Sequence, residues 1–169
     1  GDKLYNNNIF LKMLGISKDI KYPGLNVLPP GVERHVVNGG GLTAFQIFPD
    51  DELEIINNEG NQICEIICFN KDGNSDVGIL NLKSNNEKNF IRNILSGNDE
   101  TILATNYQLK KRNLKISNSK SSIIFDLDTK PGEKIKLKSK DKCYTIFSAP
   151  GEDMDVTKQN PPTDLTIFV

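Results

Sequence analysis

The sequence predicts an all-β fold, a barrel or sandwich of about ten short strands with one or two short helices. Three observations indicate this class. Apolar and polar residues alternate in short runs, as they do in strands that bury one face. Turn-forming residues separate the runs, as in Pro29–Gly31 and Lys130–Glu133. The runs also recur at the spacing of sandwiches and barrels, without the regularly interleaved helices of a parallel sheet.

The alternating runs set the order of the expected elements. The candidate strands are 33–37, 42–48, 52–57, 62–69, 77–82, 101–109, 114–117, 122–127, 134–138, 143–147 and 164–168. A helix is predicted over 85–95, where Phe90, Ile91, Ile94 and Leu95 share one face and Gly97 follows as a stop. A weaker amphipathic helix is expected over 8–14. We therefore divide the chain into an N-terminal extension with a short helix, 1–24, and a β-barrel or sandwich domain, 25–169.

Length and charge exclude several classes of protein. The 169 residues suit a single domain, and the net charge of −1 gives no overall field toward nucleic acid or an acidic membrane. No apolar run approaches the roughly 20 residues of a membrane span. Three cysteines are too few and too scattered for a disulfide scaffold, which favours a reducing, cytoplasmic location. The lysine-rich runs 110–112 and 136–140 are interpreted as solvated faces.

Both ends of the sequence favour a fragment of a longer protein. The chain opens on Gly1-Asp2 without a methionine, and it closes on the apolar, strand-like run 165–169. Natural termini usually lie in exposed polar segments. We therefore expect the rest of a parent polypeptide as a partner.

The run Ile123–Thr129 imitates a catalytic motif. An apolar strand ending in Asp-x-Asp-x-Thr is how haloacid-dehalogenase-type phosphatases present a nucleophile and an acid/base beside Mg²⁺. Here Asp126-Leu127-Asp128-Thr129 follows such a strand but lacks the residue, often Gly, before the Thr. The alternating helices of that fold are missing from the 40 residues that follow. We interpret both aspartates as turn residues and keep phosphoryl transfer only as a minor alternative.

The thiols and the single histidine do not form a site on sequence grounds. Cys64 and Cys68 lie in a strand-like run, where their sulfurs point the same way about 13 Å apart, too far for a shared zinc or a disulfide. Both, with Cys143, are expected to be core thiols. His35 is the only histidine and is interpreted as structural. We predict no catalytic residue and no metal site in this chain.

One stretch carries a family resemblance. The entry Leu28-Pro29-Pro30-Gly31, the strand 42–48 and the hairpin 51–70 resemble the urea carboxylase-associated family. The matching polar positions are Gly60, Gln62, Glu65 and Asn70. The resemblance covers about the first seventy residues, and it implies an aminomethyltransferase-related domain placed ahead of a glycine-cleavage T-protein-like, folate-dependent module.

The sequence departs from this family at the positions where activity would be expected. The segment 101–130 contains neither Cys nor His, where catalytic relatives are expected to carry them. We therefore predict an accessory or small-ligand-binding β domain of a larger, aminomethyltransferase-like protein. This domain would need no cofactor, folate would belong to the parent, and the ligand would be a small nitrogenous compound. The alternative is a hydrolase domain for a urea- or guanidine-type compound.

Five residues are predicted to contact the ligand. In the strand 62–69, Glu65 shares a face with Ile63, Ile67 and Phe69, so its carboxylate needs a partner if that face is buried. Arg34, Arg92 or Arg112 could supply one. The predicted ligand-binding residues are Gln62, Glu65, Asn70, Arg92 and His35.

Overall fold

A computed structural model describes residues 31–85, 89–117, 119–151 and 161–169. The extension 1–24, with the helix predicted over 8–14, lies outside the described residues. The fold below is that of the region from Glu33 to Val169, which forms one compact unit.

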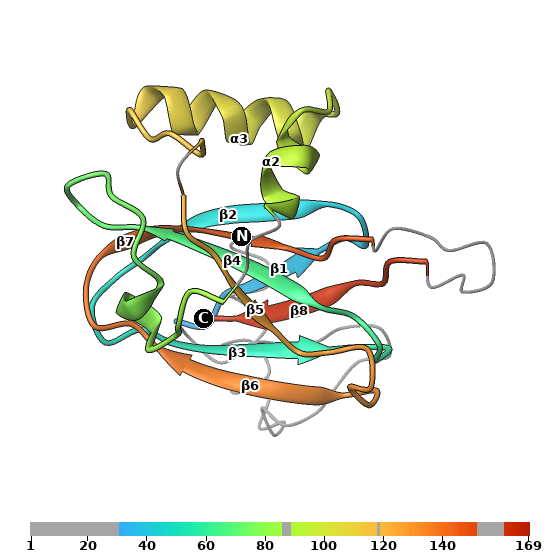
Figure 1. The fold of residues 1–169 in the computed structure, drawn as a ribbon. Helices are drawn as coiled ribbons and strands as arrows, with labels where there is room; N and C mark the ends of the chain where they lie inside the picture. The colour runs from blue at the N-terminus through green and yellow to red at the C-terminus, as the bar shows by residue number, and fades with distance from the viewer. Residues whose placement is uncertain (1–30, 86–88, 118, 152–160) are drawn as a thin grey trace, which may run out of the picture. The chain divides into compact units, whose positions relative to one another are not determined.

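Two four-stranded antiparallel sheets make up this region (Figure 1). The outer sheet has the strand order β1 (Arg34–Val37), β8 (Leu165–Phe168), β3 (Glu52–Asn57) and β6 (Glu133–Lys138). The central sheet has the order β2 (Leu42–Ile47), β7 (Cys143–Ser148), β4 (Cys64–Phe69) and β5 (Ser122–Ile124). The predicted all-β class is confirmed, and the arrangement is a sandwich rather than a closed barrel.

The central sheet is buried on both faces, as β4 illustrates. All six residues of β4 are buried. Cys64, Ile66 and Cys68 pack into the core between the two sheets. Ile67 and Phe69 belong to a second core on the opposite face. The two faces predicted from strand alternation are thus confirmed, and Glu65 lies on the side of the second core.

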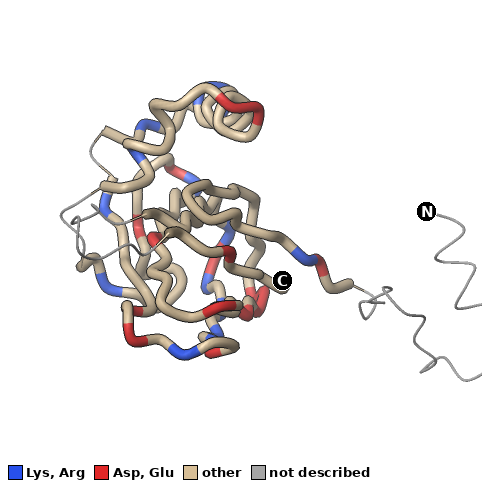
Figure 2. The backbone as a smooth tube through the Cα atoms, turned by 90° about the vertical axis from the view of Figure 1, so that its right-hand side faces the viewer, with Lys and Arg blue, Asp and Glu red and all other residues tan. Residues whose placement is uncertain are grey.

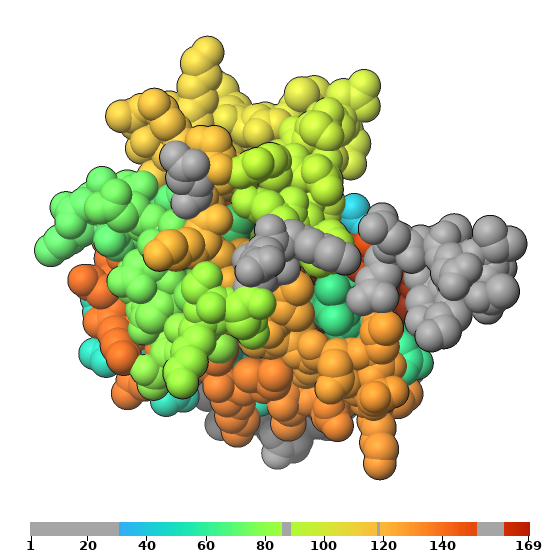
Figure 3. All heavy atoms as spheres, viewed as in Figure 1, coloured from blue at the N-terminus to red at the C-terminus, as the bar shows by residue number. Residues whose placement is uncertain are grey.

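Two helices cover that second face of the central sheet. α2 (Phe90–Leu95) and α3 (Glu100–Lys111) place Ile91, Leu95, Ile102 and Leu109 against residues of β4 and β7. Figure 1 shows both helices above the central sheet, with the outer sheet below it. In the space-filling view the helices, yellow-green to yellow, form the upper part of this face (Figure 3). The region therefore has three layers.

The strand predicted over 101–109 is wrong, because this segment is the core of α3. The Asp99 carboxylate caps the helix by accepting a hydrogen bond from the Ile102 N–H at 2.9 Å. Ile102, Thr105 and Leu109 are buried at spacings of three and four, which is the helical period. Glu100 lies in the first turn and two lysines in the last, as the helix dipole favours.

Three other predicted boundaries change. Residues 77–82 were expected as a strand, but η1 (Val77–Leu80) is a 3-10 helix that begins where the Asp76 carboxylate accepts from the Gly78 N–H. The segment 114–117 forms no strand. β5 ends early because Phe125 has a positive φ of 63°, which strand geometry excludes.

Lysines line the exposed edge of the outer sheet. β6 is an edge strand, and its alternating residues Lys134, Lys136 and Lys138 are exposed. Lys134 lies 3.7 Å from the carboxylate of Glu54 on β3. The exposure of these lysines confirms that the lysine-rich run 136–140 forms a solvated face. A charged edge strand also resists pairing with other chains. Figure 2 shows basic and acidic positions interspersed along the chain. Among the described helices, none is both long enough and apolar enough to cross a membrane.

Candidate functional site

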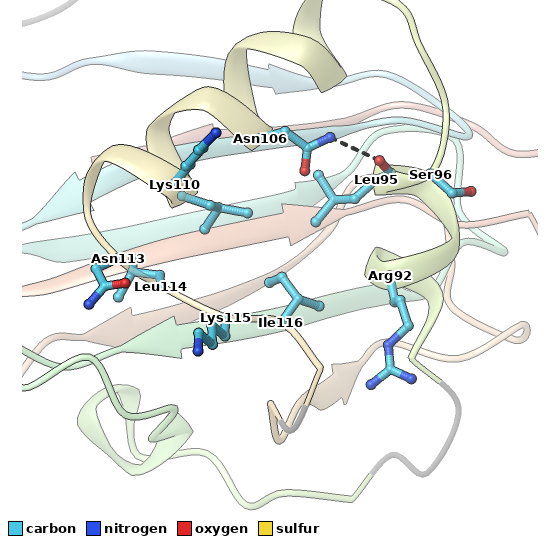
Figure 4. Close-up of a pocket in the computed structure, with 10 residues that line it drawn as sticks. Arg92, Leu95, Ser96, Asn106, Lys110, Asn113, Leu114, Lys115 and Ile116 are labelled. Carbon is cyan, nitrogen blue, oxygen red and sulfur yellow. Dashed lines mark hydrogen bonds between the residues drawn. The ribbon is translucent and has the colours of Figure 1, made fainter.

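An open groove of about 470 Å³ lies between α2, α3 and the segment that follows α3 (Figure 4). We call it the α2–α3 groove. Four aliphatic side chains line it, from both helices and from the segment that returns toward the sheet: Leu95, Leu109, Leu114 and Ile116. The remaining lining residues are polar: Arg92, Ser96, Asn106, Lys110, Asn113 and Lys115.

A polar contact joins the two helices at the groove. The Asn106 side-chain amide of α3 donates to the Leu95 carbonyl at the end of α2, at 2.9 Å (Figure 4). This bond satisfies a carbonyl that the end of a helix leaves without an intrahelical donor. The chain then reverses after α3 because Asn113 takes a left-handed φ of 57°, and the Leu114 N–H bonds back to the Leu109 carbonyl. The reversal brings Leu114 and Ile116 to the groove.

The lining of the groove is positively charged. Arg92, Lys110 and Lys115 are exposed cations, and none of the lining residues is acidic. The Arg92 guanidinium donates to the Ser117 carbonyl, which ties α2 to the returning segment. An aliphatic floor under three cations suits a ligand with an apolar body and an acidic group.

Glu65 of β4 lies at the start of α2, the helix that carries Arg92. The buried Glu65 carboxylate accepts hydrogen bonds from the Phe90 and Ile91 N–H groups, at 3.0 and 2.9 Å. These are the first two residues of α2. Glu65 therefore fixes the start of the helix that carries Arg92, and the backbone supplies donors that the sequence could not reveal.

Gln62 and Asn70 are placed away from the groove. Gln62 is buried, and its amide donates to the carbonyls of Ile63 and Pro150 while accepting from the Thr163 N–H. Asn70 follows β4, where its side-chain oxygen accepts from two N–H groups of the next turn. Both amides bind backbone groups, in the way that local side chains stabilise turns.

His35 lies on β1 in the outer sheet. Its ring stacks on Phe45 with the centroids 3.9 Å apart, and its Nε2 lies 3.3 Å from a Glu33 carboxylate oxygen. The stacking on Phe45 supports the interpretation of His35 as a structural residue. His35 and Gln62 do not line the α2–α3 groove, and Asn70 lines a different cavity from Arg92.

The three thiols are buried, as predicted, but two of them meet. The Thr145 hydroxyl lies 3.6 Å from the Cys68 sulfur and 3.2 Å from the Cys143 sulfur. The hydrogen bond with Cys68 lowers the pKa of Cys143 to about 7, although burial opposes this. The same hydrogen bond, together with burial, raises the pKa of Cys68 well above its usual value. This pair was not predicted, because sequence spacing relates only Cys64 and Cys68, which lie on one strand.

The two aspartates of the imitated phosphatase motif are turn residues, as predicted. Asp126 and Asp128 are exposed, and the Asp126 carboxylate accepts from the Asp128 N–H at 2.9 Å. Within the same turn, the Thr129 hydroxyl accepts a hydrogen bond from the Asp126 N–H and donates one to the Asp126 carboxylate. Within the described ranges, no group of three or more His, Cys, Asp or Glu side chains is placed to hold a metal ion.

Lys110, Lys115 and Asn106 are groove residues that the sequence analysis missed. A signal for the two lysines is present in the charge pattern. The segment 101–120 carries five basic residues and no acidic one, so the other 149 residues together carry a net charge of −6. Such an asymmetry in a nearly neutral chain indicates a local anion preference.

Comparison with known proteins relates the chain to part of a longer enzyme. No family model matches the chain, so the resemblance to the urea carboxylase-associated family stays a prediction. The chain is 30% identical over 150 residues to trimethylamine-oxide aldolase of Ruegeria pomeroyi. This match covers 89% of the chain and 19% of that enzyme. The chain thus spans about a fifth of the length of the curated relative it matches.

Proposed function

We propose that the chain is an accessory β-sandwich region of a protein related to trimethylamine-oxide aldolase, and that it binds a small acidic ligand in the α2–α3 groove. The observation that carries the ligand proposal is the lining of the groove, with three cations, four aliphatic side chains and no acid. The match to a part of a longer enzyme supports the accessory role.

The candidate nucleophiles and bases of this region occupy structural positions. The thiols are buried, His35 is stacked on Phe45, and Asp126 holds its own turn. The hydrolase alternative therefore lacks an observation in its favour, and we do not carry it forward. We assign the reaction, and with it the folate predicted from the resemblance, to the parent protein.

The positive charge of the groove limits the class of ligand that we propose for it. A cationic amine or guanidine would meet three like charges, whereas a carboxylate would form charge-assisted hydrogen bonds with Arg92. The small nitrogenous ligand expected from the sequence is thus proposed to carry an acid group as well. A compound such as N-acetylleucine, with a branched apolar body, an amide and a carboxylate, fits this description.

Titration of the 169-residue chain with N-acetylleucine tests the ligand proposal. We expect saturable changes in the backbone amide resonances of residues 92–96 and 106–116. The Arg92→Gln variant should bind at least about tenfold more weakly, because a charge-assisted hydrogen bond is lost. Lys111→Gln is the matched control, since Lys111 is an exposed cation of α3 that does not line the groove.

Two outcomes would contradict the proposal. Equal binding of the neutral N-acetylleucine amide would remove the role of charge, and unchanged affinity in Arg92→Gln would remove the groove as the site. The accessory role is tested separately by incubating the chain alone with trimethylamine oxide. We expect no consumption of that compound, and turnover by the chain alone would overturn this part.

A further inference from the structure

A second cavity of about 380 Å³ opens at the end of the central sheet, beside the turn that follows β4. We call it the Arg112 cleft. Its floor holds the buried rings of Phe69 and Tyr144, and Arg112, Lys142 and Lys71 are cations of its lining. It shares Asn113 and Leu114 with the α2–α3 groove, so that turn separates the two cavities.

The Arg112 guanidinium is held in place by two neighbouring strands. Its central carbon lies 4.5 Å from the centroid of the Tyr144 ring on β7. Its Nη1 donates to the Gln46 side-chain oxygen on β2, at 3.2 Å. Gln46 and Tyr144 face each other in the register of the two strands. Such stacking fixes the plane of the guanidinium before any ligand arrives.

The fixed guanidinium retains most of its hydrogen-bonding capacity. A guanidinium has five N–H donors, and Gln46 is the partner that Arg112 finds among the described residues. Burial raises the pKa of Tyr144, which Arg112 opposes, and the ring stays a neutral phenol near pH 7. With three cations against the one acid, Asp72, the cleft carries a net positive charge. This arrangement matches a planar oxyanion bound edge-on.

We propose that the Arg112 cleft is a second ligand site, which takes a small molecule with an apolar body and a carboxylate bound edge-on to the Arg112 guanidinium. A guanidinium held over the Tyr144 ring distinguishes it from the α2–α3 groove. The half-buried Leu114 side chain in the lining offers apolar surface beside that guanidinium. The site stands independently of the function proposed for the groove.

Benzoate is the probe for this site, with benzamide as its neutral analogue and inorganic phosphate as a non-aromatic anion. In amide-resonance titrations of the 169-residue chain we expect saturable benzoate shifts at Gln46, Arg112 and Tyr144. Benzamide should bind at least about tenfold more weakly because the ion pair is absent. Phosphate should also bind more weakly because it has no apolar surface to place against Leu114. Shifts confined to the α2–α3 groove, or equal affinity for benzoate and benzamide, would overturn the assignment.

Variants separate a binding role from a purely structural one. Arg112→Gln should lose the benzoate shifts, and Arg112→Lys should retain the charge but bind about tenfold more weakly without the planar fork. Lys111→Gln, one residue earlier and outside the cleft, should bind as the unmodified chain does. If Arg112→Gln does not fold, Arg112→Lys decides the question, and undiminished binding there would contradict the proposal. N-acetylleucine binding in the same variants reports on the groove alone.

Discussion

At the scale of single residues, Gly60 is constrained by both its backbone and its neighbours. Its φ is +75°, and a Cβ at this position would lie 2.5 Å from the Thr129 carbonyl oxygen. Gly132 has a similar φ of +80° but open space around it. Alanine substitutions at these two positions therefore distinguish the cost of a left-handed backbone from the cost of a steric collision.

We expect Gly132→Ala to lower the free energy of unfolding by about 1–2 kcal/mol, the usual cost of a left-handed alanine. Gly60→Ala should lose roughly 1–3 kcal/mol more, because the backbone of residues 129–131 must move away from the new methyl group. Urea denaturation of both variants measures the difference. Equal losses would show that the contact with Thr129 imposes no steric limit.

The Cys68 and Cys143 pair gives the stability a pH dependence. The pKa of Cys143 falls from 9.0 to about 7 in the folded chain. Between these values the folded state has released a proton that the unfolded state still holds, so stability rises with pH across this window. The raised pKa of Cys68 acts above it, where stability falls again as pH rises.

Ultraviolet absorbance of the thiolate checks this prediction. The folded chain should form one thiolate with a midpoint near pH 7, and Cys143→Ser should abolish that step. Cys64→Ser is the control, because burial raises the pKa of Cys64. A chain without any thiolate below pH 8 would contradict the hydrogen-bonded pair.

At the scale of elements, the attachment of α2 depends on Glu65. This carboxylate is fully buried and binds the first two N–H groups of the helix. Glu65→Gln keeps the shape of the side chain but replaces one carboxylate oxygen with an amide NH₂ group. That group is a donor and would face a backbone N–H donor of α2. We expect a loss of about 1–3 kcal/mol in the free energy of unfolding, as for a buried group left without its partner.

Thermal and urea unfolding measure the effect of Glu65→Gln, and the exposed Glu59→Gln serves as the matched control. Hydrogen exchange adds a local readout. The N–H groups of Phe90 and Ile91 should lose protection before those of β4 do. Stability within about 0.5 kcal/mol of the unmodified chain would show that the carboxylate is dispensable.

At the scale of the whole region, strand alternation predicted the sandwich well. The strand over 52–57 has the predicted bounds, because its alternating residues face the core on one side only. The segment 101–109 was predicted wrongly because Thr, Ile and Tyr favour strands locally. The segment is a helix because it packs on the central sheet and is capped by Asp99. Neither contact can be recognised from the local alternation of apolar and polar residues.

Of the predicted ligand-binding residues, Arg92 lines the groove proposed as the site. It was selected as a partner for Glu65, whose carboxylate accepts hydrogen bonds from the backbone of α2. The groove itself could not be foreseen, because one of its walls is the helix α3 that was expected as a strand. A binding surface between two elements requires that both be assigned correctly.

The turn at Asn113 and Leu114 gives the molecule a property that neither cavity has alone. Both residues line the α2–α3 groove and the Arg112 cleft. We expect a ligand that shifts this turn in one cavity to change the affinity of the other, by a factor that thermodynamic linkage makes equal in both directions. Titrations of each probe in the presence of the other would give that factor. A single reversal of the chain would then act as the coupling element between two chemically different ligands.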